Sequence, residues 1–579
     1  MSSSSGKFIV VGGGLAGLMT TIRLAEAGRH VDIFSIVPCR RSHSVCAQGG
    51  INASVNTKGE GDSPQIHFEE TIYGGDYLAN QPMVKAMCEA APEIVYMFDR
   101  WGVAFNRTPE GLIDFRRFGG TKFHRTAFAG STTGQQLMYA LDEQVRRFEA
   151  EGLVKRYEGW EFLSGVMDNT QTVRGIVAID LVSLELKTFR ADAVILCTGG
   201  VGMIYGRSTN STICTGSAAG AVFKQGVWYA NGEFVQVHPT AIPGEDKNRL
   251  MSEAIRGEGG RVWTYKDGKP WYFLEEWYPK YGNLVPRDIA SRAIFKVCRE
   301  LKLGIDGKDL VYLDISHLDT KALEQKLGGV IEIYQKFVGE DPKKVPMRVF
   351  PSVHYTMGGI YIDDRHATNV PGIFAAGECE YQYHGANRLG ANSLLSCIYG
   401  GELVAKRAVQ YVDSLKENAQ DASSKFFEQE LKREREANDR LLRSGGKENP
   451  YLLWEEMAKW MTDHVTVVRK NKDIQATDQK LKELSERYKD ISLNDTGNWV
   501  NQALIFAREL ENMLVIARVI TLGALARNES RGSHYKPEFP DRNDKEWLKT
   551  TVAKWVPKGI ELTYEKVDIS LITPKERKY

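Results

Sequence analysis

Two histidines and two arginines stand in separate loops in the middle of the chain. They are His238 in HPT, Arg287 in PRD, His354 in HYTMGG and Arg388 in GANRLGANSLL. Arginine grips carboxylates with two parallel hydrogen bonds, and histidine adds directed hydrogen bonds. Together the four side chains predict an anion site, most naturally for a dicarboxylate.

Each of these residues also has an ordinary structural interpretation. His238 precedes a proline and fits a turn. Arg287 fits a local salt bridge with Asp288. Arg388 fits a pair with Glu378. Taken singly, each residue favours the structural interpretation, so the anion site depends on their combination.

A glycine motif near the N-terminus predicts a dinucleotide site. GGGLAG (12–17) matches G-x-G-x-x-G, with an apolar strand before it and a helix after it. Gly12 permits the tight turn, and Gly14 lets the backbone approach a pyrophosphate at the helix N-terminus. His43, in RRSHSVCAQGG (40–50), follows closely and on its own is an ordinary loop histidine.

The second strand of this βαβ unit departs from the standard pattern. An acidic residue usually ends that strand and holds a ribose hydroxyl. Ser35 stands there instead, and Asp32 lies inside the strand. The serine weakens the expected ribose contact, and the motif alone does not distinguish FAD from NAD.

Composition excludes several classes of protein. The 579 residues are 42% hydrophobic and 26% charged with a net charge of +1, so a nucleic-acid surface and a polybasic anchor are disfavoured. No apolar run approaches the roughly 20 residues of a spanning helix. The N-terminus lacks the pattern of a secretory signal.

The eight cysteines occur singly, and no CxxC is present. This argues against a zinc ribbon and against an iron–sulfur cluster held by this chain. Free thiols in a reducing compartment are the simplest interpretation, and we predict no metal site.

The elements that must position these residues are spread along the chain. Apolar strands are expected at 7–11, 191–200 and 372–379, and one sheet would bring them together. After about residue 405 the sequence turns charged and helical, and residues 503–524 carry one apolar stripe suited to helix packing. We expect the last 45 residues to wrap a surface.

The whole chain resembles the flavoprotein subunits of succinate dehydrogenase and fumarate reductase (the succinate:quinone oxidoreductase family), especially the bacterial membrane-bound forms. Nine motifs occur in the family's order between residue 8 and about residue 545: RRSHSVCAQGG, FRRFGG, HPT, SEAIRGEGG, PRDIASR, HYTMGG, AAGEC, NRLGANSLL and NESRGSHYK. So many ordered motifs are far more specific than the glycine motif.

The resemblance implies an α/β fold, in which a Rossmann-like FAD-binding domain carries an inserted α+β capping domain and is followed by a helical domain and a C-terminal extension. We predict the FAD-binding domain at 1–235 and 346–405, the capping domain at 236–345, the helical domain at 406–534 and the extension at 535–579.

The resemblance also assigns the flavin. His43 matches the histidine bonded covalently to FAD, which raises the flavin's potential. Gln48 matches the residue that is glutamine in the dehydrogenases, and it favours succinate oxidation. The predicted cofactor contacts are Gly12, Gly14, Leu15, Ala16, Gly17, Ser35, Ser42, His43, Ser44, Gln48, Gly49, Gly50, Glu378, Arg388, Asn392, Ser393 and Leu394. Ser217 departs from the family, because TGSA replaces TGDG and the expected acidic flavin contact is missing.

For the substrate, the resemblance assigns three roles. Arg287 matches the arginine that transfers a proton, and Glu253 and Arg256 match a relay behind it. Succinate oxidation requires Arg287 to accept a proton, although free arginine has a pKa above about 12. The predicted substrate contacts are Phe118, His238, Ser252, His354 and Arg388.

Partners are implied in the same way: an iron–sulfur subunit, a membrane cytochrome b anchor and, through them, quinone, with this chain peripheral to the cytoplasmic face of the cell membrane. Two enzyme alternatives stay open. One is fumarate reduction in vivo, and the other is an L-aspartate oxidase-like flavoenzyme, which lacks the linking histidine. A flavin-dependent RNA-binding protein is disfavoured by the even charge balance.

Overall fold

A parallel sheet forms the centre of the structure, a computed structural model that describes residues 6–578. Its strand order is β19-β10-β1-β2-β6, and every neighbouring pair is parallel. The strands are β1 (Lys7–Val11), β2 (His30–Ser35), β6 (Val154–Glu158), β10 (Ala193–Leu196) and β19 (Ile373–Ala375). The three strands expected from the sequence are therefore adjacent, which confirms the predicted α/β fold.

Alternation along β1 divides the core between the two faces of the sheet. Phe8 and Val10 are buried on one face, and Ile9 and Val11 belong to the core on the other. Successive side chains of a strand point to opposite faces, so the continuous apolar run KFIVV is what a strand covered on both sides requires.

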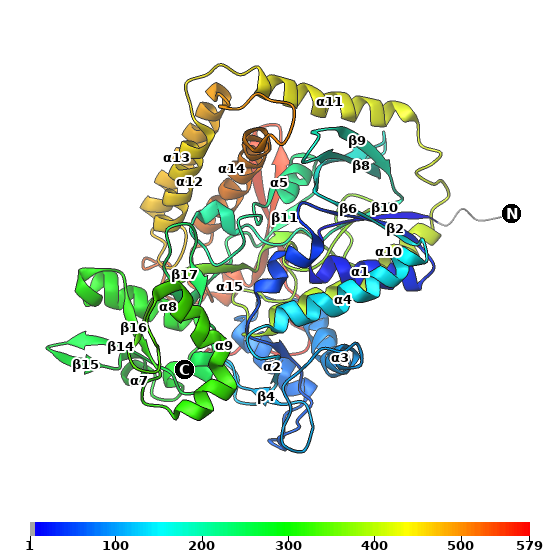
Figure 1. Ribbon diagram of the computed structural model, residues 1–579. Coiled ribbons are helices and arrows are strands. Elements are labelled where there is room, and N and C mark those ends of the chain that lie inside the picture. The colour runs from blue at the N-terminus through cyan, green and yellow to red at the C-terminus, as the bar shows by residue number, and fades with distance from the viewer. Residues whose placement is uncertain (1–5, 579) are drawn as a thin grey trace.

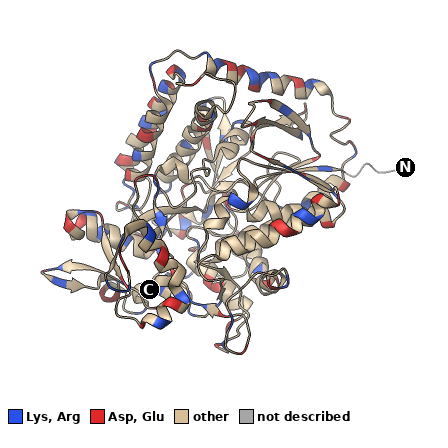
Figure 2. Cartoon of the chain, in the orientation of Figure 1, with Lys and Arg blue, Asp and Glu red and all other residues tan. Residues whose placement is uncertain are grey.

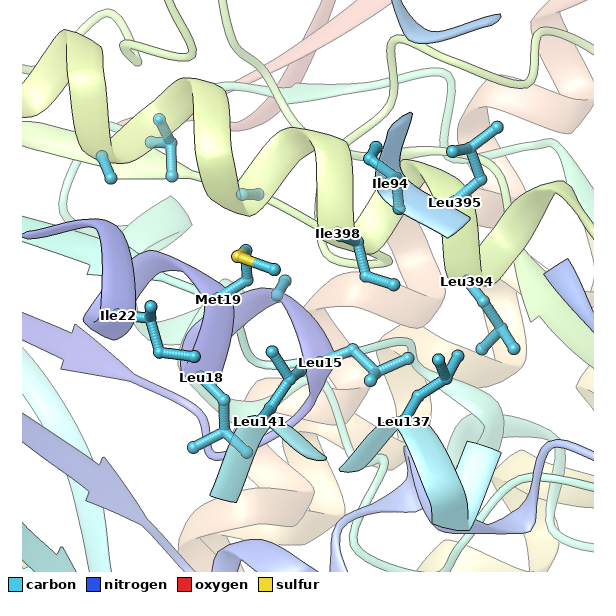
Figure 3. Close-up of a cluster of buried hydrophobic side chains, with 14 of the residues drawn as sticks. Leu15, Leu18, Met19, Ile22, Ile94, Leu137, Leu141, Leu394, Leu395 and Ile398 are labelled. Carbon is cyan, nitrogen blue, oxygen red and sulfur yellow. The ribbon is translucent and has the colours of Figure 1, made fainter. Parts of the chain in front are cut away.

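Helices cover the first face. Leu15, Leu18, Met19 and Ile22 of α1 meet side chains of α4 and α10 in a common cluster (Figure 3). The helices on this side are α1 (Leu15–Glu26), α2 (Pro64–Gly74), α3 (Gln81–Arg100), α4 (Thr133–Ala150) and α10 (Asn392–Asp413). This packing fixes the N-termini of both α1 and α10 beside the ends of the strands.

The second face is covered by an antiparallel layer and by helices from the C-terminal part of the chain. Phe34 of β2 shares a core with Val222 of α5 and with Leu510 and Met513 of α14. The elements are β7 (Trp160–Met167), β8 (Val173–Asp180), β9 (Leu186–Arg190), α5 (Ser217–Lys224) and α14 (Gln502–Ala526). Residues about 300 positions apart thus meet over one sheet.

The middle of the chain builds a separate six-stranded sheet, ordered β13-β12-β17-β16-β14-β15, with its own core. Its strands are β12 (Val235–Ile242), β13 (Arg249–Leu250), β14 (Arg261–Lys266), β15 (Lys269–Trp271), β16 (Val311–Asp314) and β17 (Met347–Thr356), and its helices are α6 (Ala254–Gly257), α7 (Phe273–Trp277), α8 (Arg287–Phe295) and α9 (Thr320–Val338). β12 runs across the first predicted boundary of the capping domain, and β17 begins just after the second boundary although it pairs within this sheet. The division into domains stays a prediction.

Three short strands lie between the central parallel sheet and the six-stranded sheet of the middle segment. They are β3 (Ile51–Asn52), β4 (Phe115–Arg116) and β5 (Thr126–Ala127), which pair in one small antiparallel sheet. Gly50 directly precedes β3 and Phe118 closely follows β4, so this sheet positions both residues.

The C-terminal helices are α11 (Ser424–Leu442), α12 (Pro450–His464), α13 (Asn471–Arg487) and α14. Lysine, arginine, aspartate and glutamate are mixed along α11, whereas α14 lies inside and is mostly uncharged (Figure 2). Leu504, Ile516 and Val519 are buried in addition to the predicted stripe. The stripe was too narrow a prediction, because α14 is enclosed by neighbours on more than one side.

The C-terminal extension adds strands to a sheet as well as wrapping a surface. β20 (Lys549–Val556) pairs with β21 (Gly559–Lys566) and with β11 (Tyr229–Ala230), which pairs in turn with β18 (Gly359–Ile360). A short helix, α15 (Asp544–Trp547), precedes this hairpin. The chain then returns to the middle segment (Figure 1), where Arg577 contacts Asp288 of α8 and the Lys578 N–H donates to Tyr73 of α2.

The final residues bind to the FAD-binding and middle segments at once. Arg577 Nη1 lies 3.3 Å from Asp76 Oδ2 and 3.1 Å from Asp288 Oδ2. Asp288 is the second residue of α8 and directly follows Arg287. Among residues 6–578, no helix combines the length and the apolar character needed to cross a membrane.

Candidate active site

The glycine motif forms a turn with no room for side chains. A Cβ on Gly12, whose φ is +116°, would lie 2.1 Å from the carbonyl oxygen of Cys197, and a Cβ on Gly17 would lie 1.8 Å from that of Gly12. Gly14 caps α1 without a side-chain hydrogen bond, and the Leu15 N–H donates to Ser44 Oγ at 3.3 Å. The free N–H groups of this helix N-terminus suit a pyrophosphate.

A long cavity extends from this turn in two directions. One lobe reaches Ser35 at the end of β2, and the other reaches Arg287 in the middle segment. Leu15, His43 and Ser44 line both lobes, so the two are continuous. The predicted cofactor residues that line at least one lobe are Gly12, Gly14, Leu15, Ala16, Ser35, Ser42, His43, Ser44, Gln48, Gly49, Gly50, Glu378, Arg388, Ser393 and Leu394.

His43 lies at the junction of the lobes. The Ser211 N–H donates to its Nδ1 at 3.1 Å, and its Nε2 lies 3.1 Å from Nδ2 of Asn210. Burial, with a smaller contribution from Lys247, lowers the pKa of His43 to about 4. The imidazole is therefore neutral near pH 7 and keeps a lone pair on Nδ1.

The loop after His43 is held by an arginine that the sequence analysis did not select. Arg116 Nε donates to the Gly49 carbonyl at 3.0 Å, and its Nη2 donates to the Gln48 carbonyl at 3.1 Å. A Cβ on Gly49 would lie 2.8 Å from the Phe118 ring, which keeps the two segments in contact. Arg116 lies within the quoted motif FRRFGG, so the motif was the available signal.

The N-terminus of α10 supplies a second set of backbone N–H groups. Ser393 and Leu394 line the cavity, and Ala391 caps the helix without a side-chain hydrogen bond. The Asn392 side chain turns away from the cavity, because it is fully bonded to Asn52, His67 and Thr71. A flavin contact by Asn392 would therefore use its backbone.

Glu378 stands where both lobes meet and accepts the Thr356 N–H at 3.0 Å. Burial raises its pKa to about 7, although that hydrogen bond and the charge of Arg388 act in the opposite direction. The carboxyl group is therefore half-protonated near neutral pH.

Arg287 is bound to Glu253 rather than to its neighbour Asp288. Its Nε and Nη2 donate to Glu253 Oε2 at 3.0 and 2.8 Å, and its Nη1 donates to Gln236 at 2.9 Å. Arg256 Nη2 donates to the other oxygen of Glu253 at 2.7 Å. Arg287, Glu253 and Arg256 thus form one buried hydrogen-bonded network. The local salt bridge between Arg287 and Asp288 is excluded.

The two neighbouring arginines keep the Glu253 carboxyl ionised. Burial alone would raise the pKa of Glu253, but Arg287 and Arg256 together lower it. Burial lowers the pKa of Arg256, and Glu253 opposes this. A carboxylate between two guanidinium groups leaves a net positive charge in a buried place, which favours an anionic ligand.

Arg388 lies over the ring of Tyr355, with Cζ 4.4 Å from the ring centroid. Its buried Nε has no hydrogen-bond partner among the described residues, and it forms no ion pair there with Glu378. Burial, and then the charge of Arg287, lower the pKa of Arg388 to about 9. The alternative of a structural pair with Glu378 is therefore wrong.

The two histidines complete the polar wall. His238 is in part a turn residue, since its Nδ1 accepts the Thr240 N–H at 3.2 Å, but its buried Nε2 has no partner among the described residues. His354 Nδ1 lies 2.7 Å from Thr209 Oγ1. Burial, and then the charge of Arg287, lower the pKa of both imidazoles well below the usual value. His238, His354, Ser252, Phe118, Arg287 and Arg388 all line the second lobe.

Comparison with known proteins decides the family. Residues 7–394 match the FAD binding domain model, and residues 454–579 match the model of the fumarate reductase flavoprotein C-terminal part. The chain is 64% identical over 581 aligned residues to the succinate dehydrogenase flavoprotein subunit of Bacillus subtilis, covering 100% of this chain and 99% of that one.

More distant relatives agree. The fumarate reductase flavoprotein subunit of Escherichia coli is 35% identical, with coverage of 100% and 96%. The flavoprotein chain of a solved Escherichia coli quinol fumarate reductase superposes with a TM-score of 0.92 at 34% identity, with coverage of 99% and 98%. The chain belongs to the succinate dehydrogenase and fumarate reductase flavoprotein family. It is an oxidoreductase that binds FAD.

The FAD lobe near Ser35 contains acidic residues that the sequence analysis did not select. Glu161 of β7 and Glu509 of α14 line it together with Ser217. Ser217 Oγ accepts a hydrogen bond from Asn512 Nδ2 at 3.1 Å. No local motif could have found this set in a flavoprotein of this family, because the residues come from three remote segments.

Within the described residues, no group of three histidine, cysteine, aspartate or glutamate side chains is placed to hold a metal ion. The eight cysteines are unpaired thiols.

Proposed function

We propose that this chain oxidises succinate to fumarate at the second lobe of the cavity. The observation that carries the proposal is the buried group of Arg287, Arg388, His238 and His354, which presents unpartnered nitrogen atoms and net positive charge beside His43. A dicarboxylate supplies the two negative charges and the acceptor oxygens that these groups lack.

Arg388 would bind one carboxylate of the substrate, with its guanidinium plane fixed against Tyr355. His238 Nε2, His354 and the Ser252 hydroxyl would hold the remaining oxygens. Binding at both ends orients the central carbons, and this proximity is a large part of catalysis. Gly49 and Phe118 close the cavity on the side of the loop that follows His43.

Bound FAD supplies the acceptor for the hydride that leaves one central carbon. Arg287 can take up the proton from the other central carbon once one of its own protons has passed to Glu253, whose Oε2 accepts from Nε and Nη2 of Arg287, while Nη1 stays bonded to Gln236. Glu253 is bonded to both Arg287 and Arg256, so it is the first group able to carry the proton onward. In fumarate reduction Arg287 gives the same proton in the reverse direction.

We further propose that FAD is joined covalently to Nε2 of His43. An imidazole substituted at Nε2 keeps its lone pair on Nδ1, and the Ser211 N–H already donates to Nδ1. The low pKa of His43 keeps the ring neutral, with its one proton on Nε2, and a bond from Nε2 to the flavin would replace that proton. Flavin fluorescence that stays with the protein in an acid denaturing gel tests the bond, and complete loss of flavin would refute it.

Gln48 and the 64% identity to a succinate dehydrogenase subunit support oxidation as the working direction. The 35% identity to fumarate reductase subunits supports the reverse reaction as the second candidate. An L-aspartate oxidase-like activity is disfavoured by the placement of His43 in the cavity.

Electrons would leave through a docked iron–sulfur subunit and a membrane cytochrome b anchor to quinone, with this chain peripheral at the cytoplasmic face of the membrane. The absence of a spanning helix and of a metal-holding cluster among residues 6–578 is consistent with such partners. A similar solved structure is that of a quinol-fumarate reductase with menaquinol molecules, which supports a quinone as the electron-transfer partner.

Succinate oxidation coupled to an artificial dye, with and without malonate, tests the proposed function. We expect turnover that depends on succinate and is inhibited competitively by malonate. Turnover without malonate inhibition, or none in the flavin-loaded protein, would overturn the substrate assignment.

A further inference from the structure

Ser217 occupies the place where the resemblance led us to expect an acidic contact to the cofactor. It begins α5, and its hydroxyl bonds to Asn512 rather than pointing freely into the cavity. α5 therefore supplies no carboxylate to this part of the FAD lobe. Two other segments bring carboxylates to the same place.

Glu161 and Glu509 line the lobe on either side of Ser217. Glu161 is 5% exposed, and its Oε2 has no hydrogen-bond partner among the described residues. Arg508, the nearest cation in sequence to Glu509, is bonded to Glu434 and Asn438 instead. The carboxylates therefore face the cavity without a bonded cation.

This part of the cavity is the adenosine end. The pyrophosphate position is fixed by the N-terminus of α1, and His43 marks the direction of the flavin ring. The opposite direction leads past Ser35, at the end of β2, where dinucleotide folds place the ribose of adenosine. Glu161 and Glu509 lie in this lobe, and neither lines the lobe that contains Arg287 and Arg388.

We propose that Glu161 and Glu509 bind the adenosine half of FAD and replace the acidic contact missing at Ser217. Their oxygens accept hydrogen bonds from the donors of adenosine, which are the ribose hydroxyls and the adenine 6-amino group. α14 thereby contributes a cofactor residue to a domain whose strands lie several hundred residues earlier.

The pKa shifts of Glu161 and Glu509 are consistent with binding to adenosine. Burial raises the pKa of Glu161, although the charge of Arg508 and a hydrogen bond from Ser217 act in the opposite direction. Burial, and then repulsion from Glu161, raise the pKa of Glu509, against a hydrogen bond from Thr215. Ionising both carboxyl groups is therefore costly in the empty fold. Donors from a bound adenosine would relieve this cost, whereas a purely structural role would not explain the pair.

The test measures reversible flavin binding in the full-length chain carrying His43→Ser, so that no covalent bond hides the affinity. In this background Glu509→Gln and Glu161→Gln are each titrated with FAD and with FMN, which lacks adenosine. We expect each variant to weaken FAD binding about tenfold, as the loss of a hydrogen bond to a charged group does, and to leave FMN binding unchanged.

Glu511→Gln is the matched control on the same helix, because Glu511 is surface-exposed and pairs with Lys224 outside the cavity. FAD binding should be unchanged in this control. The melting temperature of each flavin-free Glu161 or Glu509 variant should stay the same or rise, since repulsion is removed. FAD carrying hypoxanthine in place of adenine separates the two donors: an undiminished effect of the variants assigns the ribose, and a lost effect assigns the amino group.

Unchanged FAD affinity, or an equal loss for FMN, would overturn the proposal. A fall in the melting temperature of the flavin-free variants with no change in the preference for FAD over FMN would also overturn it, by showing a structural role. None of these measurements depends on succinate turnover, so failure here leaves the proposed reaction untouched, and failure of that reaction leaves this assignment untouched.

Discussion

The two ends of the cavity are built from opposite kinds of side chain. The substrate end holds Arg287, Arg256 and Arg388 around the single ionised carboxylate of Glu253. The adenosine end holds the carboxyl groups of Glu161 and Glu509, whose pKa values are raised by burial. Each end buries ionisable groups at a cost in free energy, so each is arranged for a ligand of matching chemistry rather than for the stability of the empty protein.

The largest expected effect is at the substrate end. Arg287→Lys keeps a cation beside Glu253 but removes the planar group that would exchange the proton. Turnover with succinate should fall by about 10²–10⁴-fold, which is the usual contribution of general acid–base catalysis. Dye-coupled steady-state kinetics measure this, while malonate binding should change little.

Arg292→Lys is the control for that substitution. Arg292 lies on the same helix, one turn later, and contacts Asp288 rather than Glu253. Its turnover should match the wild type. Near-normal turnover in Arg287→Lys would remove Arg287 from proton transfer.

A smaller effect is expected for Arg388→Gln. Loss of the guanidinium removes the charged partner of one substrate carboxylate and should weaken malonate binding about 10–100-fold. Titration of the flavin absorbance with malonate measures the dissociation constant. Arg388 is also a predicted flavin contact but does not line the lobe at the adenosine end, so FAD affinity in the His43→Ser background should fall less than malonate affinity. An equal loss of both affinities would mean that the two ends are not separate.

Ser217→Asp tests the adenosine end by adding a carboxylate instead of removing one. It restores the acidic residue of the family pattern but places a third carboxylate beside Glu161 and Glu509. FAD binding in the His43→Ser background should weaken about tenfold because of this repulsion. Adding Glu509→Gln should recover the affinity. Tighter FAD binding by Ser217→Asp alone would show that the end lacks acidic groups after all.

The smallest expected effect is a dependence on pH. The pKa values of His238 and His354 are lowered well below the ordinary 6.5, so both rings are neutral above that pH and take up no proton on going from pH 8 to 6.5. The histidines therefore add no pH dependence in this range, and the expected gain in malonate affinity on acidification, at most severalfold, comes from protonation of Glu378, whose pKa is about 7. A severalfold gain that persists in a Glu378→Gln variant would mean that cationic histidines bind the dicarboxylate.

Sequence predicts the substrate end better than the adenosine end for a physical reason. His238, Arg287, His354 and Arg388 belong to short motifs whose composition is unusual in itself, and the βαβ unit is a local structure with a strong periodic pattern. The expectation that all four lie in loops was wrong, because His238 lies in β12, His354 lies in β17 and Arg287 begins α8. The predicted strand at 7–11 coincides with β1.

The adenosine end depends on docking between distant segments. Glu161 and Glu509 become neighbours only because α14 packs over the sheet, and the apolar stripe of 503–524 indicated packing but not its partner. Asn392 illustrates the same limit. Its motif places it at the flavin, but only the tertiary structure shows that Asn52, His67 and Thr71 occupy its side chain.

The contact of Arg577 with Asp76 and Asp288 has a consequence for the order in which the molecule is completed. Arg577 lies 501 positions after Asp76 and 289 positions after Asp288, so the contact closes two very long stretches of chain at once. The helix that begins with Arg287 is thus secured by a segment made much later than the helix itself. A nascent chain can build the sheet and the glycine turn early, whereas this anchor of the middle segment forms only once residue 577 has emerged.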